Sequence, residues 1–111
     1  MEPITWNDFE KIEMRVGAIL EVHDFPEARN PSYQLIIDFG DLGIKKTSAQ
    51  ITQLYTKEQL PGKQVVAVVN FPPKQIANFM SECLMLGAVG ENKEVTLLEL
   101  GLPVPNGLRI A

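Results

Sequence analysis

The sequence has too few cysteines and histidines for the sites that these residues usually build. Among its 111 residues there is one cysteine, Cys83, and one histidine, His23. A lone cysteine excludes an internal disulfide, and one cysteine with one histidine cannot supply the ligands of a zinc tetrad. Apolar residues follow Cys83 directly, so we expect a buried, inert thiol. We predict no metal, and a reducing, cytoplasmic compartment fits this cysteine usage.

Long apolar runs and an excess of positive charge are also missing. No stretch approaches the roughly 20 apolar residues of a membrane-spanning helix, and residues 1–6 lack the pattern of a secretory signal. The net charge is −4. That value argues against nonspecific coating of nucleic acid, which depends on neutralising phosphates. A local basic patch stays open, with Lys45 and Lys46 as the only adjacent basic pair.

Recognisable catalytic machinery is lacking as well. His23 falls on the polar face of a predicted strand, and Cys83 lies among apolar residues. No glycine-rich phosphate loop is present, and the carboxylates are dispersed along the chain. We therefore predict a non-enzymatic binding module without a cofactor.

Alternation of apolar and polar residues is what the sequence does have. Residues 12–23 alternate in this way and predict a strand. Its inward face would carry the apolar residues Ile12, Met14, Val16, Ala18, Leu20 and Val22. So long a strand must bend in a small barrel, and Gly17 is the predicted bulge. Before this strand, Thr5 and Asp8 predict a capped helical turn.

The rest of the chain predicts further short strands with few helices. Strands are expected over residues 33–39, 44–49, 64–70, 81–87 and 94–100, a capped helix over 50–59, and a linker over 75–80. This pattern favours an all-β OB-fold, a five-stranded Greek-key barrel in a single domain covering residues 1–111. Apolar pieces at both ends exceed what the barrel needs, so we predict a homodimer that buries them.

One face of such a barrel is the expected ligand surface. Polar residues of the third strand and of the fourth-strand exit would meet there: Lys45, Lys46, Ser48, Gln50, Asn70, Lys74 and Ser81. Phe25, Phe71 and Phe79 are candidates for stacking on bases. An ordinary solvated face, with the aromatics in the core, explains the same residues equally well.

Several segments resemble the tRNA-binding domain family. Residues 8–17 (DFEKIEMRVG), 60–66 (LPGKQVV) and 104–110 (VPNGLRI) are similar to its DFxKVDLRVG, LVGKxVV and VPPGxRV segments. Ser81 and Glu82 match the start of its SEGM motif. Three passages, DFPEAR (24–29), TSAQIT (47–52) and VVNFPPKQIA (68–77), resemble the CsaA group of export-related chaperones within that family.

The resemblance implies an OB-fold homodimer that docks through its terminal extensions and binds unfolded preproteins or peptides. It implies a peptide pocket lined by Phe71, Leu84 and Met85, although core packing would explain Leu84 and Met85 equally well. The alternative is a structure-specific tRNA-binding protein that uses Asn70, Lys74, Ser81 and Arg109. A lysine of the family is missing from the loop at residues 25–31, and a leucine, Leu84, replaces the motif methionine. Both departures, together with the net negative charge, argue against strong binding of tRNA.

Overall fold

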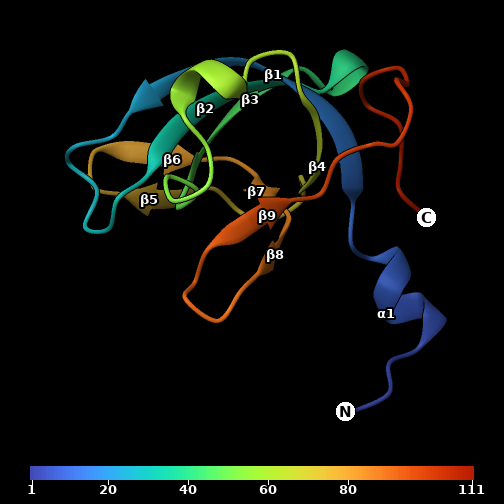
Figure 1. The fold of residues 1–111 in the computed structure, drawn as a ribbon. Coiled ribbons are helices and arrows are strands. Elements are labelled where there is room, and N and C mark those ends of the chain that lie inside the picture. Colours follow the sequence, from blue (N-terminus) through green and yellow to red (C-terminus); the bar gives the residue numbers. More distant parts are fainter.

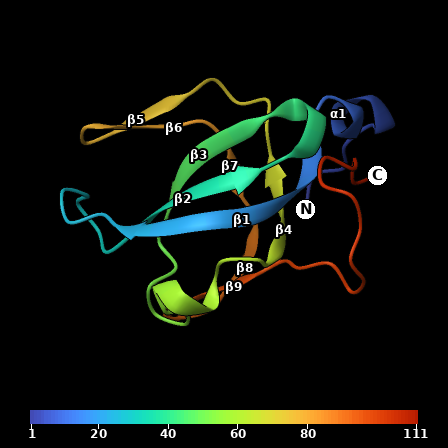
Figure 2. The same cartoon turned by 90° about the horizontal axis from the view of Figure 1, so that it is seen from above.

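Five antiparallel strands form a sheet that curls into a nearly closed barrel. The computed structural model describes residues 1–111, and Figures 1 and 2 show the barrel in two perpendicular views. Its strands lie in the order β3-β2-β1-β4-β7. Their bounds are Met14–Asp24 for β1, Tyr33–Asp38 for β2, Ile44–Ala49 for β3, Gln64–Val68 for β4 and Leu84–Met85 for β7. The predicted OB-type barrel is confirmed.

Two hairpins and three short helices complete the fold. β5 (Lys74–Ile76) pairs with β6 (Phe79–Ser81), and β8 (Gly87–Val89) pairs with β9 (Val95–Leu97). Helix α1 covers Trp6–Glu10, and the 3-10 turns η1 and η2 cover Gly40–Leu42 and Lys57–Gln59. The predicted capping box of Thr5 with Asp8 is confirmed, and Thr56 forms a second capping box with Gln59.

The first half of β1 has its faces reversed relative to the prediction. Gly17 pairs with Val65, and Ile19 pairs with Ile37 on the side of the core. Leu20, predicted to point inward, is exposed. The bulge lies between Ile19 and Glu21 and not at Gly17, and it returns Val22 to the core side. Alternation alone could not identify the inner face, because both faces of this strand carry apolar residues.

The C-terminal segment pairs with the edge of β1 that β2 leaves free before Ala18. The Val16 N–H donates to the Leu108 carbonyl over 2.9 Å, and the Gly107 N–H donates to the Val16 carbonyl over 2.7 Å. The Ile110 N–H continues this pairing to the Met14 carbonyl. The Val16 side chain is buried outside the main core and lies opposite Val66 of β4.

The predicted helix over residues 50–59 is wrong, and only its last three residues form the turn η2. The rest forms a turn over residues 52–54 with irregular backbone on either side, held by tertiary contacts. The Tyr55 carbonyl accepts a hydrogen bond from the Tyr33 hydroxyl, and the Tyr55 hydroxyl accepts one from the Leu97 N–H. Ile51 is buried in the core. These tertiary contacts outweigh the helical preference of the segment, because an α-helix would not bring the same groups to these partners.

Two predictions after β4 are also corrected. The linker expected over residues 75–80 is the β5–β6 hairpin, and the strand expected over 81–87 is divided among β6, β7 and β8. The expected strand is interrupted because its hydrogen-bonding partner changes from β3 to β4 along this segment. The Glu82 N–H bonds to the Lys46 carbonyl on β3, whereas the Leu86 N–H bonds to the Val66 carbonyl on β4. The strand expected over 94–100 shortens to β9.

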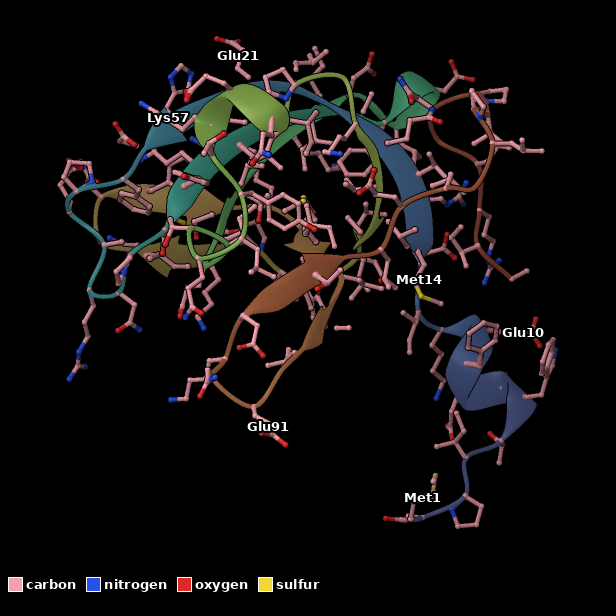
Figure 3. The ribbon with its side chains drawn as sticks, viewed as in Figure 1. Met1, Glu10, Met14, Glu21, Lys57 and Glu91 are labelled. Atoms are coloured by element: carbon pink, nitrogen blue, oxygen red, sulfur yellow. The ribbon has the colours of Figure 1, made fainter.

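The N-terminal segment lies away from the barrel. Figure 3 shows that the chain from Met1 to Glu10 lies below Met14, outside the barrel. Helix α1 has no buried residue, and Trp6 is 71% exposed. None of the helices is long and apolar enough to cross a membrane.

Candidate functional site

A hollow opens between β3 and the β5–β6 hairpin. Figure 2 shows this hairpin alongside β3. Its volume is about 350 Å³, within the range of small ligand sites. β3 contributes Ser48, and the segment after β4 contributes Phe71 and Pro72. The hairpin and the chain that follows it supply the remaining lining residues: Lys74, Ile76, Ser81, Cys83 and Leu84.

Aromatic packing holds the hairpin in this position. The Phe79 ring lies 5.4 Å from the Phe25 ring, and the Lys46 ammonium lies 5.2 Å from the centre of the Phe79 ring. Phe25 and Phe79 are both buried, so neither ring is free to stack on a base. Ala77 makes the tight hairpin turn at φ 53°. The hairpin therefore forms one fixed wall of the hollow.

Hydrogen bonds around Thr47 close the barrel beneath the hollow. The buried Thr47 hydroxyl donates to the Cys83 carbonyl over 2.7 Å and lies 2.9 Å from the Ser81 hydroxyl. The Glu82 carboxylate accepts from the Lys46 N–H over 2.9 Å. Ser81 and Glu82, both predicted ligand residues, thus join β3 to the segment before β7.

Cys83 lies in the wall of the hollow as an unreactive thiol. Its side chain is buried among core residues. Burial raises the pKa of the Cys83 thiol to about 11, and the hydrogen bond with Thr47 lowers it only in part. The thiolate is the nucleophilic form of cysteine, so at neutral pH Cys83 contributes apolar surface to the site.

A second hollow, of about 580 Å³, continues the first toward the β8–β9 hairpin. The two hollows share Ser48, Ile76 and Leu84. We call their union the apolar groove. Its second part is lined additionally by Ala28, Arg29, Asn30, Ser32, Ala49, Gln50, Ile51, Met85, Val89, Lys93 and Val95.

Most of the predicted site residues meet in this groove. Those that line it are Ser48, Gln50, Phe71, Lys74, Ser81, Leu84 and Met85. Lys45 and Lys46 do not line it. The Lys46 ammonium packs on the Phe79 ring, and Lys45 is half-buried on β3 opposite Ile37.

Asn70 and Arg109 hold the N-terminal segment instead. The Asn70 side chain donates to the Lys11 carbonyl over 2.7 Å and accepts from the Glu13 N–H over 3.0 Å. Arg109 donates to the Glu10 carbonyl over 3.0 Å, and its guanidinium lies 3.6 Å from the Glu13 carboxylate. The hydrogen bond from Arg15, with the nearby charges of Arg109 and Arg15, lowers the pKa of Glu13.

Several groove residues were missed by the sequence analysis. Ile76 belonged to a presumed linker, and Arg29, Val89 and Lys93 lie in segments distant in sequence from the predicted site. A signal for Ile76 was available: Asn78 is a turn-forming residue, and the apolar residues Ile76 and Phe79 flank the turn. No local pattern marks the other three.

Comparison with known proteins identifies the family of this chain. Residues 14–109 match the model of a family described as "Putative tRNA binding domain". The chain belongs to the tRNA-binding domain family. This confirms the family resemblance drawn from the sequence motifs.

Two solved structures of relatives align over nearly the whole chain. The chaperone CsaA from Bacillus anthracis is 47% identical, with a TM-score of 0.95, and covers 99% of this chain and 100% of its own. CsaA from Picrophilus torridus is 55% identical, with a TM-score of 0.91 over 98% of this chain and 100% of its own.

The family also occurs inside much larger proteins. The methionine–tRNA ligase of Nanoarchaeum equitans is 36% identical over 107 residues, which are 96% of this chain and 13% of the ligase. A ligase-related protein of Pyrococcus horikoshii, 28% identical, aligns over the full length of both chains with a TM-score of 0.89. The chain thus spans about an eighth of the ligase that it matches.

Proposed function

We propose that the protein is a non-catalytic, CsaA-like chaperone of the cytoplasm whose apolar groove binds extended segments of unfolded preproteins. The exposed apolar side chains of the groove carry this proposal. Phe71 is 55% exposed and Leu84 48% exposed at the rim of the first hollow. Large apolar side chains gathered at a hollow typically mark a binding surface. The similarity to two CsaA chaperones supports the same function.

Replacing Leu84 by serine tests the groove directly. We expect weaker binding of a fluorescein-labelled apolar peptide and weaker suppression of aggregation of a chemically unfolded protein. Removing a half-buried leucine contact costs about 1–2 kcal/mol, which corresponds to roughly 5- to 30-fold in affinity. Leu20→Ser is the matched control, because Leu20 is 44% exposed on the outer face of β1. Equal losses in both variants would refute a role for the groove.

We further propose that the protein works as a homodimer. Helix α1 carries the exposed Trp6 and follows the exposed Ile4, so a second copy is the available cover for these side chains. Trp6→Ser should then shift the molar mass measured by light scattering from dimer to monomer. A dimeric mass that this variant leaves unchanged would contradict the proposed role of the segment.

Binding of tRNA is the second candidate function, and membership of the tRNA-binding domain family favours it. Filter binding of bulk tRNA at several salt concentrations tests it. Phosphate contacts would make the logarithm of affinity fall linearly with the logarithm of salt concentration. A weak affinity without this dependence would remove the candidate.

A further inference from the structure

The charged side chains that line the apolar groove are all cationic. Lys74 lines the first hollow, Arg29 and Lys93 line the second, and neither hollow is lined by a carboxylate. A third hollow of about 230 Å³ continues the groove past Lys93 and is also free of carboxylates. The chain as a whole has 14 acidic and 10 basic residues. The groove therefore has the opposite sign of charge from the molecule around it.

These three cations have no carboxylate partner within the protein. The ion pairs of lysine and arginine lie elsewhere and join Arg15 and Arg109 to Glu13, Lys57 to Asp24, and Lys63 to Glu99. Arg29, Lys74 and Lys93 are exposed. A carboxylate on a ligand would meet their charge without first displacing an internal partner.

The cations lie on either side of the apolar middle of the groove. Ile76 and Leu84 line both hollows, Lys74 lines only the first, and Arg29 and Lys93 line only the second. We propose that the groove selects apolar polypeptide segments flanked on both sides by acidic residues and disfavours segments flanked by lysine or arginine. This inference rests on the proposed polypeptide-binding function and adds a rule of charge to it.

The size of the effect follows from the exposure of the three cations. An exposed ion pair changes an equilibrium constant by about 1.4- to 5-fold. Attraction of acidic flanks and repulsion of basic flanks act at both ends, so the two peptide types should differ in affinity by at least about fourfold at low salt. The difference should shrink at physiological salt, where screening acts over about 8 Å.

Fluorescence anisotropy with matched peptides tests the rule. Three labelled peptides share one apolar core and carry aspartate, glutamine or lysine flanks. We expect the aspartate peptide to bind most tightly and the lysine peptide most weakly. Lys74→Gln and Lys93→Gln should each weaken binding of the aspartate peptide about 1.4- to 5-fold and weaken binding of the glutamine peptide less. Lys63→Gln is the control, because it changes the net charge equally but pairs with Glu99 outside the groove.

The outcomes separate the charge rule from the proposed function. If the three peptides bind equally well, the charge rule is wrong and polypeptide binding stands. If none binds, both are wrong. If no peptide binds but bulk tRNA does, and Lys74→Gln weakens that binding, the cations serve phosphates and the charge rule is overturned.

Discussion

Replacing Gly17 by alanine would test how the barrel is packed. A Cβ at this position would lie 2.5 Å from Cγ2 of Ile37 and 2.6 Å from Cε1 of Phe39. Carbon atoms in good contact lie about 3.5–4.0 Å apart, so these atoms must separate by about 1 Å. Ile37 and Phe39 are completely buried. Neither can swing into solvent to make room for the methyl group.

The expected cost is the overpacking energy less a small gain from the unfolded state. Overpacking of a filled core costs about 1–3 kcal/mol, and a glycine-to-alanine change recovers about 0.4–1 kcal/mol by restricting the unfolded chain. We expect a net destabilisation of about 1–2 kcal/mol. In a domain near this size that lowers Tm by about 4–8 °C for each kcal/mol.

Urea denaturation followed by circular dichroism measures the change. Circular dichroism is preferable to fluorescence, because Trp6 is the one tryptophan and lies exposed on α1. Gly101→Ala is the control: nothing lies within 4 Å of its added Cβ, and its φ is not positive. That variant should be unchanged or slightly stabilised. A Gly17→Ala protein as stable as the parent at the same concentration and m-value would refute the packing argument.

Three further predictions concern the site and its supports. Thr47→Val should lower the free energy of unfolding by about 1–3 kcal/mol, measured in urea, because it leaves the Cys83 carbonyl and the Ser81 hydroxyl without their buried partner. The Cys83 thiol should react slowly with a disulfide reagent at pH 8 and quickly in urea, since burial raises its pKa to about 11. The lowered pKa of Glu13 stabilises the fold above its unfolded value of 4.5, and this stabilisation is lost as pH falls through the folded value. Glu13→Gln should therefore flatten the pH dependence of Tm below about pH 5.

β1 illustrates which part of the fold was accessible from sequence. Its alternation identified a long strand at nearly the observed bounds, because a period of two is a local property. The inner face was assigned wrongly, because it depends on the bulge after Ile19 and on the pairing of Val16 with Val66, which are buried outside the main core. Both are long-range features that a local pattern does not contain.

The candidate site was likewise predictable only where the strand pattern placed its residues, and not where distant loops contribute to it. Ser48, Lys74 and Ser81 were predicted as one surface because an OB barrel places the corresponding strands together, and all three line the first hollow. Arg29 and Lys93 were missed, since only the folded chain brings the loop after β1 and the β8–β9 turn to the groove. Phe25 was considered for base stacking, and its burial against Phe79 emerges only from the tertiary packing of the hairpin.

The family motifs carry more information about the scaffold than about the ligand. Asn70 and Arg109 fasten the N-terminal segment, and Glu82 ties β3 to the chain before β7. An RNA-binding and a polypeptide-binding protein would need these bonds equally, so their presence weighs on neither side. In our proposal the groove discriminates between the two ligands, because exposed apolar side chains line its middle and unpaired cations flank them. A polyphosphate ligand would use the cations alone, whereas an apolar segment with acidic flanks would use both.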